Sequence, residues 1–458
     1  MLLSRSEQAR QNFISAVILI ADDTGLKGIM DRTEFSSHPF SSPIANQPST
    51  AAIQPELNPL DAAKTHKARL RRYLSLADFE VAAKKYLPHP LYAYVSGGVE
   101  DNRSCEENIR AFQFHEFQPR VLRDVSGRST ATTLFGREYA APFGIGPMGI
   151  AALIAYDGDR VMASAAAQAG LPMVLSGASL TAMEAVAEAG RGNAWFQAYL
   201  PGDIELIRGV ATRAQEAGYE TLVLTADTAA RANRENNIRA GFSTPLRPSV
   251  KLAYQGLTHP RWLVGNLLRT VLHQGIPCFE NTEKGRGVPV ISSQAARQFN
   301  RDSLNWEHVK AMRAAWRGNL VLKGVLHPGD ARMAAQLGVD GIVVSNHGGR
   351  QLDGAVAPLK VLTAVAEAAG AMKVIYDGGV RRGSDVLKAL ALGADFVFVA
   401  RPFMYAAAVG GEAGVGHCIG LLKEEVRRNM ASLGVCDIDS IDASILHAGQ
   451  GPAFFALS

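Results

Sequence analysis

The stretch of the chain best equipped for chemistry is residues 345–354, which read Ser-Asn-His-Gly-Gly-Arg-Gln-Leu-Asp-Gly. Its histidine, His347, can exchange a proton near neutral pH, and Arg350 can hold a carboxylate through two parallel hydrogen bonds. The glycines between them allow a tight turn and the close approach of a flat ligand. A base beside a carboxylate-binding cation could bind a small acid and take a proton from it. A solvated polar loop is the alternative interpretation.

Three more charged residues could complete such a site. Asp227 could hold the imidazole of His347 in the required tautomer and stabilise its protonated form, and Arg234 could join Arg350 in binding one carboxylate. Lys323 ends a short apolar run. Because burying a lysine without a negative partner is costly, Lys323 should face an anion or an electron-accepting ring; a Schiff-base lysine is the alternative.

A phosphate site is predicted at residues 377–384, Asp-Gly-Gly-Val-Arg-Arg-Gly-Ser. The glycines expose backbone amides before a helix N-terminus, where the helix dipole favours an anion, and Arg401 after Ala400 adds a second cation. An ordinary turn is the alternative. The chain has no G-x-x-x-x-G-K-[ST] and no G-x-G-x-x-G after a predicted strand, which argues against nucleotide binding by those two motifs.

The elements that would position these residues repeat along the chain from residue 142. Each unit has a short apolar run, a loop and a helical stretch, of which residues 159–169, 204–217, 306–316 and 384–392 are examples. The apolar runs cover residues 143–146, 173–176, 195–199, 222–225, 320–323, 342–345, 374–377 and 396–400. Eight such units predict an α/β fold of the TIM (β/α)8 barrel type; a doubly wound sheet would need a topological switch point and usually has fewer strands.

The catalytic groups of such a barrel lie at the carboxyl ends of its strands. There the sequence places mostly glycine, polar and charged residues: Pro147, Met148, Gly149, Ser176, Gln197, Tyr199, Thr225, Asp227, Lys323, His347, Arg350, Asp377, Gly378, Gly379, Ala400 and Arg401. A single polar residue at a strand end is usually a satisfied packing contact. So many of them together indicate one shared site.

The barrel domain is expected over residues 71–458. Ser75, followed three residues later by Asp78, predicts the start of a helix that runs to about Tyr86. A polar, β-leaning segment that ends at about Tyr139 predicts a small hairpin that plugs one end of the barrel.

Residues 1–70 are expected to be a disordered N-terminal extension without chemistry, because residues 33–59 are rich in Ser, Pro, Asn and Gln. Its apolar run, residues 13–21, is too short to span a bilayer and is followed by two aspartates rather than by a cleavage site. Met30 offers an alternative start.

One predicted βα loop, residues 228–300, is far longer than usual. Residues 260–272 within it place six apolar side chains on one helical face: Leu263, Val264, Leu267, Leu268, Val271 and Leu272. Four basic residues flank this face: Arg247, Lys251, Arg261 and Arg269. With Trp262 as an interfacial aromatic at its edge, such a segment can lie in a membrane surface, so residues 245–275 are a candidate membrane contact; an active-site lid and a subunit contact are the alternatives.

Composition and cysteine content narrow the class of protein. The chain has 458 residues, of which 47% are hydrophobic, enough for a large core. Its net charge of +4 is small for this length and gives no indication of nucleic-acid binding. The four cysteines are far apart and form no C-x-x-C pair: Cys105, Cys278, Cys418 and Cys436. This spacing argues against a disulfide framework and a zinc site, and it suits a reducing, cytoplasmic location.

Several of these motifs together resemble the FMN-dependent L-2-hydroxy acid oxidase and dehydrogenase family, which includes glycolate oxidase, lactate oxidase, L-lactate dehydrogenase and (S)-mandelate dehydrogenase. The motifs that carry the resemblance are residues 94–98, 224–228, 322–324, 345–354 and 377–383. The resemblance extends over about residues 72–440, and residues 345–354 are its most specific part. It implies an FMN cofactor.

The resemblance also implies roles for individual residues. His347 is similar to the family's active-site base, with Asp227 behind it, and Lys323 would lie at the N1–C2 carbonyl edge of the flavin. The substrate carboxylate and hydroxyl would be bound by Tyr94, Tyr199, Arg234 and Arg350. The isoalloxazine ring would be lined by Pro147, Met148, Gly149, Ser176, Gln197 and Thr225. The ribityl and phosphate groups would be bound by Asp377, Gly379, Arg381 and Arg401, with Ser345, Gly378 and Ala400 as further cofactor contacts.

Four local features refine the resemblance. Ala400 stands where the family often has Gly, which adds a methyl group near the phosphate. Gly149 stands where oxidases tend to carry Ala and is similar to mandelate dehydrogenase and lactate monooxygenase, which argues against rapid reaction with oxygen. Residues 175–179 are small where glycolate oxidase has a bulky aromatic, so a larger substrate side chain is expected to fit. The long basic loop, including residues 258–262, is similar to the membrane-binding segment of mandelate and lactate dehydrogenases.

We therefore expect the protein to oxidise an L-2-hydroxy acid, lactate-like or mandelate-like, to the 2-oxo acid and to pass the electrons to a quinone or another carrier. We expect it to be cytoplasmic, with residues 245–275 attaching it to the inner face of the cell membrane, and to form a homo-oligomer, a tetramer as is common among related proteins. The alternatives are a soluble oxidase that uses O2 and makes H2O2, an FMN-barrel isomerase, and a non-catalytic flavin-binding or scaffold protein.

Overall fold

The computed structural model describes residues 68–199, 203–243, 245–247, 249–282, 285–292 and 302–447. The expected N-terminal extension therefore lies outside the described residues, except for residues 68–70. In the parts that are described, no helix is both long enough and apolar enough to cross a membrane.

Eight parallel strands close into a barrel, in which each strand pairs with the next along the chain and the last pairs with the first. They are β3 (Phe143–Ile145), β4 (Met173–Ser176), β5 (Ala194–Ala198), β6 (Thr221–Thr225), β7 (Asn319–Val325), β8 (Gly341–Val344), β9 (Lys373–Asp377) and β10 (Phe396–Val399). Most strand residues are buried, which explains why these segments read as short apolar runs in the sequence. The predicted (β/α)8 barrel is confirmed.

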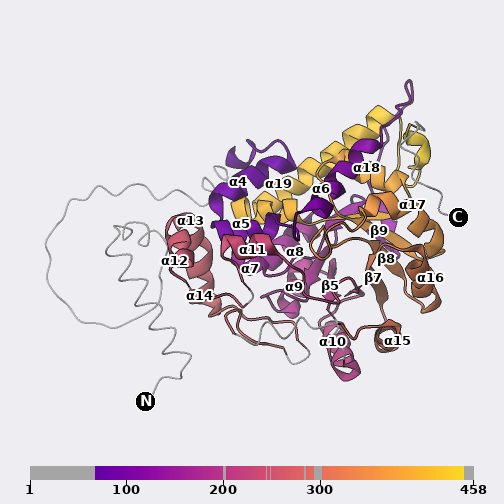
Figure 1. The fold of residues 1–458 in the computed structure, drawn as a ribbon. Coiled ribbons are helices and arrows are strands. Elements are labelled where there is room, and N and C mark those ends of the chain that lie inside the picture. Colours follow the sequence, from indigo (N-terminus) through magenta and orange to yellow (C-terminus); the bar gives the residue numbers. More distant parts are fainter. Residues whose placement is uncertain are drawn as a thin grey trace, which may run out of the picture. The chain divides into compact units, whose positions relative to one another are not determined.

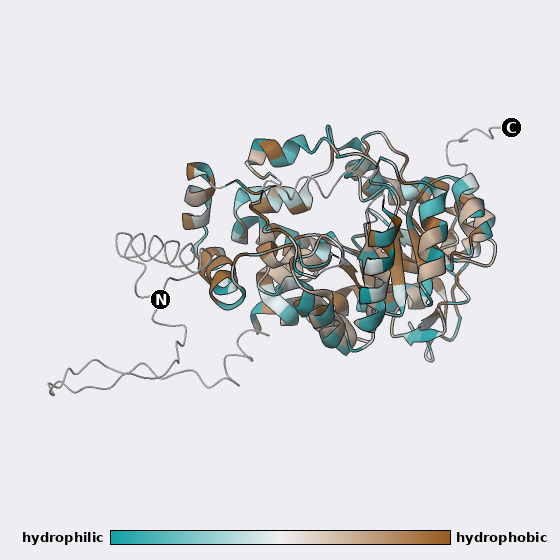
Figure 2. Ribbon diagram, turned by 90° about the horizontal axis from the view of Figure 1, so that it is seen from below, coloured by the Kyte–Doolittle hydropathy of each residue, from teal (hydrophilic) through white to brown (hydrophobic). Residues whose placement is uncertain are grey.

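Helices surround the barrel (Figure 1). The main ones are α8 (Gly158–Gln168), α9 (Met183–Gly190), α10 (Ile204–Glu216), α15 (Trp306–Ala315), α16 (Pro328–Gln336), α17 (Pro358–Ala369), α18 (Gly383–Ala391) and α19 (Arg401–Leu433). Figure 2 shows that hydrophobic residues concentrate on the strands and alternate with hydrophilic ones on the helices, as expected for helices that pack one face on a sheet. Within α19, Gly411 has non-helical backbone angles and bends the helix.

The segment before the barrel forms its cap. The helix α4 (Leu76–Tyr86) begins as predicted, with the side chain of Asp78 accepting a hydrogen bond from the amide of Ser75. The helices α5 (His89–Ser96) and α6 (Arg103–Arg110) and the 3-10 turn η1 (Ala111–Phe114) follow. The backbone of α6 reaches the carboxyl ends of the strands, because a Cβ on Gly379 would collide with the carbonyl of Asn108.

A hairpin of β1 (Thr132–Leu134) and β2 (Arg137–Tyr139) closes the amino end of the barrel. Leu134 and Tyr139 join a buried cluster with inward-facing strand residues: Val174, Trp195, Val223, Val321, Val343, Ile375, Phe396 and Phe398. The predicted plug is therefore confirmed. Because one end of the barrel is filled by apolar packing, a ligand site is left to the other end.

The long loop after β6 is largely helical. Its helices are, in chain order, α11 (Glu235–Ala240), α12 (Val250–Leu257), α13 (Pro260–Trp262), the π-helical η2 (Leu263–Leu268) and α14 (Arg269–Gln274). The helices α12, α13 and α14 stand together at one side of the barrel (Figure 1).

The expectation that Trp262 is an interfacial aromatic is wrong. Its side chain is only 5% exposed, and its indole N–H donates to the carbonyl of Leu153 in α7 (Ala151–Ile154) at 2.9 Å. The side-chain amide of Asn266 donates to the same carbonyl at 2.8 Å. A buried indole N–H needs a partner, and here the protein core supplies it. The segment therefore packs on the barrel domain through Trp262, Asn266, Thr270 and Val271, whereas the other residues of the predicted apolar face are only partly buried: Leu263, Val264, Leu267, Leu268 and Leu272.

Candidate active site

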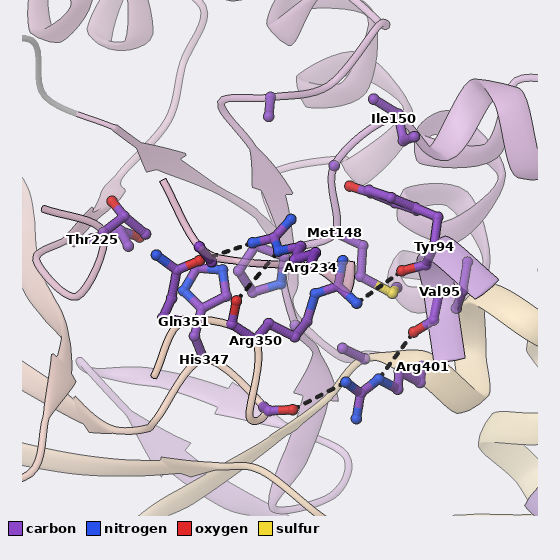
Figure 3. A pocket seen from close by; sticks show the side chains of 18 of the residues that line it. Tyr94, Val95, Met148, Ile150, Thr225, Arg234, His347, Arg350, Gln351 and Arg401 are labelled. Carbon is purple, nitrogen blue, oxygen red and sulfur yellow. Dashed lines mark hydrogen bonds between the residues drawn. The ribbon is translucent and has the colours of Figure 1, made fainter. Parts of the chain in front are cut away.

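A cavity of about 660 Å³ opens at the carboxyl ends of the barrel strands (Figure 3). All of the predicted site residues line it except Ser176, Asp227 and Ser345. Asp227 and Ser345 stand directly behind it, since they bond His347 and Lys323. The structure therefore brings together residues that are spread over most of the barrel sequence.

His347 and Asp227 form a hydrogen-bonded pair. The Nδ1–H of His347 donates to Oδ1 of Asp227 at 2.8 Å, which leaves Nε2 as the nitrogen able to take up a proton. The two side chains are 17% and 13% exposed. Gly324 must be a glycine for this pair to form, because a Cβ there would lie 2.5 Å from Cβ of Asp227 and its φ is +104°.

The environment tunes this pair in the direction that a base requires. Burial lowers the pKa of His347 below the ordinary 6.5, and the opposing effect of Asp227 does not overcome it. Burial by itself would raise the pKa of Asp227, but the interactions with His347 and Lys323 outweigh it, so the pKa of this carboxyl lies below its usual value. The result is a neutral imidazole held by an ionised carboxylate.

Arg234 and Arg350 point toward the same region as His347 (Figure 3). Arg350 donates to the carbonyls of Tyr94 and Gly97 at 2.8 and 2.6 Å, and Arg234 donates to the carbonyl of Arg350 and to the side chain of Gln351. Within the described part of the chain, neither guanidinium forms an ion pair with an acidic side chain. Burial, and then the charge of Arg234, lowers the pKa of Arg350 to about 9. Two guanidinium groups that lack an acidic partner among the described residues form a binding site for an anionic ligand.

A second pair of cations, Arg381 and Arg401, also lines the cavity. Arg401 donates to the carbonyls of Val95 and Gly348 at 3.0 Å each, and Arg381 to the carbonyl of Val380 at 2.9 Å. Neither has an ion-pair partner among the described residues. Burial, and then Arg401, lowers the pKa of Arg381. Two neighbouring guanidinium groups that meet only neutral acceptors match a phosphate group.

Lys323 differs from these arginines because the chain supplies its anion. Its Nζ lies 3.0 Å from Oδ2 of Asp377 and donates to Oγ of Ser345 at 2.8 Å. Burial alone would lower the pKa of Lys323, but Asp377 and Asp227 outweigh it and the pKa is raised. A Schiff-base lysine has to lose its proton, so this environment argues against that alternative.

Another part of the cavity wall is made of small and polar residues, which suits a flat ring. Gln197 donates to Thr225 at 2.8 Å, and both side chains are almost fully buried. Gly149 lies close to the wall, because a Cβ there would stand 3.2 Å from the hydroxyl of Tyr94 and 3.3 Å from Cβ of Ala178. A flat, phosphate-bearing cofactor needs cations for its phosphate, polar groups along its ring and a positive charge at the ring edge. Arg381 and Arg401, Gln197 and Thr225, and Lys323 could supply these in turn, so the residues present fit such a group.

Several cavity residues were not predicted from the sequence, among them Phe242, Phe279 and Gln351. The ring of Phe242 packs on that of Tyr94, with centroids 4.8 Å apart. Phe242 and Phe279 come from opposite ends of the long loop, where no periodicity marks them. Gln351 could have been found, because it follows Arg350 directly in the motif and bonds Arg234.

Comparison with known proteins matches the chain to a protein family and to individual relatives. The family model described as FMN-dependent dehydrogenase matches residues 83–448. The chain is 37% identical over 374 residues to (S)-mandelate dehydrogenase of Pseudomonas putida, a match that covers 81% of this chain and 93% of that one. It is 39% identical over 377 residues to L-lactate dehydrogenase of Caulobacter sp. (strain K31), covering 81% and 98%.

A solved structure agrees with these matches. The crystal structure of monotopic membrane protein (S)-mandelate dehydrogenase superposes with a TM-score of 0.77 at 36% sequence identity. The superposition covers 82% of this chain and 100% of that one. The likeness therefore extends over the whole barrel and not over a single motif.

Proposed function

The chain belongs to the FMN-dependent dehydrogenase family, and from this premise we propose that it oxidises an L-2-hydroxy acid, lactate-like or mandelate-like, to the 2-oxo acid and passes the electrons to a quinone or another carrier. The observation that carries the proposal is the meeting of a neutral imidazole with two arginines that form no ion pair with any acidic side chain that the structure describes. That arrangement binds a carboxylate and removes a proton next to it.

We propose that Arg381 and Arg401 bind the FMN phosphate, with the ribityl chain near Asp377. Bound FMN supplies a two-electron acceptor. The backbone of Gly378, Gly379 and Ala400 would complete the phosphate end. Lys323, backed by Ser345, would stand at the ring edge, where its positive charge favours a reduced, anionic ring. The ring itself would be lined by Pro147, Met148, Gly149, Gln197 and Thr225, with Ser176 beside Gln197 on the neighbouring strand as a further cofactor contact.

The chain's own residues would act on the substrate as follows. Arg350 and Arg234 bind its carboxylate and so fix which atom faces His347. Nε2 of His347 takes a proton from the substrate, and Asp227 stabilises the imidazolium that forms. The hydroxyl groups of Tyr94 and Tyr199 would contact the substrate carboxylate and hydroxyl.

Anaerobic bleaching of the flavin tests the proposal. We expect the absorbance of oxidised FMN to disappear on addition of at least one L-2-hydroxy acid from a panel that runs from glycolate to mandelate, and the D-enantiomers to have no effect. A yellow protein that no member of the panel bleaches would contradict the proposal and favour a non-catalytic flavin protein.

The electron acceptor is tested separately by mixing the reduced enzyme with air-saturated buffer in a stopped-flow instrument. For a dehydrogenase we expect slow reoxidation by oxygen and fast reoxidation by a quinone analogue. Fast reoxidation by air with release of H2O2 would replace the dehydrogenase proposal by the oxidase one.

The pH dependence of kcat/KM should show the lowered pKa of His347. The base works only when neutral, so activity falls as pH decreases through its pKa in the free enzyme. Because burial lowers that pKa, we expect the acid limb to have its midpoint below pH 6.5. A kcat/KM profile between pH 4.5 and 8 measures it; a midpoint clearly above 6.5 would contradict the assignment of His347 as the base.

We propose that the exposed face of α12 binds a lipid surface. Val250, Tyr254 and Leu257 recur at helical spacing and are 89%, 63% and 37% exposed. Four exposed basic residues lie in the same segment: Arg247, Lys251, Arg261 and Arg269. An apolar stripe bordered by cations is suited to an anionic bilayer surface. The monotopic membrane relative supports this proposal, and α12 lies within the expected contact segment, residues 245–275, whereas the indole of Trp262 is buried and takes no part in the contact.

Changing Val250 and Tyr254 to aspartate should reduce binding to vesicles that contain anionic phosphatidylglycerol by at least about tenfold. Each aspartate puts a negative charge where the wild type has an apolar side chain that the lipid would bury. Co-sedimentation measures the bound fraction. The matched control is Met333→Asp on α16, an exposed apolar residue on another side of the barrel (Figure 1). Equal losses in both variants, or none in the first, would exclude α12 as the contact.

We further propose a cytoplasmic barrel domain over residues 71–458 that is peripheral on the inner face of the cell membrane, with residues 228–300 as a loop insertion and residues 1–70 as an extension without catalytic residues. We also propose that the protein forms a homo-oligomer, as a tetramer. Light scattering of the purified protein tests the oligomeric state.

A further inference from the structure

Asn108 lies outside the cavity but contacts both loops that form its charged ends. It is on α6, and its side chain is 1% exposed. Its amide and that of Asn346 exchange two hydrogen bonds: Nδ2 of each donates to Oδ1 of the other, both at 2.7 Å. Asn346 directly precedes His347, so α6 is tied to the start of the loop that carries the base.

The loop that carries His347 needs external support. His347, Gly348 and Gly349 have consecutive φ values of +58°, +65° and +73°, a left-handed run that a histidine rarely adopts. Oδ1 of Asn346 also accepts the amide of Gly349 at 3.1 Å and so closes the turn around the histidine. Without its partner on α6, the Nδ2 of Asn346 would keep only the carbonyl of Val356 as an acceptor, at 3.2 Å, so the side-chain amide would be held less firmly in that position.

Asn108 also contacts the loop at the phosphate end. A Cβ on Gly379 would collide with the backbone carbonyl of Asn108, and a Cβ on Gly378 would stand 3.4 Å from its Nδ2. One residue therefore sits between the turn around His347 and the glycines before Arg381. Its main chain fits against one loop, and its side chain bonds the other.

We propose that Asn108 is a positioning residue for the oxidation reaction: its paired amide holds Asn346, and through Asn346 it fixes His347 relative to the loop of Gly378 and Gly379. This rests on the proposed function, since it requires His347 to be the base. Asn108 does not itself line the cavity in the part of the chain that the structure describes, so its side chain acts on the reaction through Asn346.

The test compares Asn108→Leu with Ser104→Ala. Ser104 is equally buried on the same helix, and its hydroxyl donates to the carbonyls of Leu352 and Ala355 farther along the same loop. We expect Asn108→Leu to lower kcat about 10- to 100-fold because a small misplacement of the base suffices for such a loss, and Ser104→Ala to change it less than about threefold. FMN absorbance per protein should stay unchanged in both.

The pH profile separates positioning from a loss of stability. A loosened turn admits water to His347, so the acid limb of kcat/KM should move to higher pH in Asn108→Leu and stay in place in Ser104→Ala. Asn108→Asp serves as the second variant if the leucine variant does not fold. When its carboxyl group is protonated it can donate to Asn346 again, so its activity relative to the wild type should recover as pH falls.

The proposal is overturned if Asn108→Leu keeps the wild-type kcat and acid limb, if Ser104→Ala loses as much activity as Asn108→Leu, or if Asn108→Asp shows no relative recovery at low pH. Bleaching of the wild-type flavin by a 2-hydroxy acid is measured alongside. If the wild type bleaches and the Asn108 variants behave like it, only the positioning role fails; if the wild type does not bleach, the proposed function fails first.

Discussion

Replacing His347 with glutamine should lower kcat by about 10³-fold, the range expected when a positioned general base is removed. Glutamine is close to histidine in size and can still donate to Asp227, but it cannot accept a proton at neutral pH. We expect KM to change little, because the carboxylate is held by Arg234 and Arg350. Steady-state kinetics with a soluble electron acceptor and anaerobic rapid mixing both measure the effect.

The matched control is His327→Gln, the same chemical change at an exposed histidine that follows β7. The control should keep kcat within about twofold of the wild type, because it has no contact with the cavity. The FMN absorbance of His347→Gln should match that of the wild type, since the cations of the phosphate end are intact. A variant that retains more than a tenth of wild-type kcat would exclude His347 as the base.

The barrel and many of the charged and polar residues of the cavity could be predicted from the sequence because each depends on local patterns. A strand buried on both faces reads as an uninterrupted apolar run, and the residue that follows it reaches the carboxyl end of the barrel whatever the rest of the chain does. Thr225, Lys323 and Asp377 were placed at the cavity in this way. Their lining of one space follows from barrel closure.

Contacts between distant segments could not be predicted from such patterns. The amphipathic period of residues 260–272 indicates an apolar face but not what covers it, and the carbonyl of Leu153 that receives the N–H of Trp262 lies more than a hundred positions earlier. The pairing of Lys323 with Asp377 joins β7 to β9, which are separated by β8. Asn108 carries no motif at all, and only the folded chain shows its amide facing that of Asn346.

Substitution of Arg350 should cause the second largest loss of activity, after substitution of His347. Changing Arg350 to methionine should lower kcat/KM for the acid by about 10²- to 10³-fold, because one partner of a buried, hydrogen-bonded charge pair is removed and the substrate carboxylate is left underpaired. Arg350→Lys should lose about tenfold, since it keeps the charge but not the planar fork. Arg234 remains in both variants and accounts for the residual binding.

Titration of the oxidised flavin with the 2-oxo acid gives a readout that needs no turnover. We expect its Kd to rise in Arg350→Met by a factor similar to the loss in kcat/KM, and the preference for the acid over the corresponding neutral amide to disappear. This follows because, among the described residues, the guanidinium of Arg350 donates to the neutral carbonyls of Tyr94 and Gly97 and pairs with no carboxylate, so its charge is available for an anion.

Arg239→Met is the matched control for Arg350→Met. It removes one positive charge from an exposed arginine on α11 that is already paired with Glu235, so it reports the long-range effect of charge alone. We expect less than a twofold change in kcat/KM, because exposed charges are screened by salt. If Arg350→Met kept its activity on a substrate without a carboxylate while losing nothing on the acid, carboxylate binding at Arg350 would be excluded, and an isomerase that uses the same barrel would become the better description.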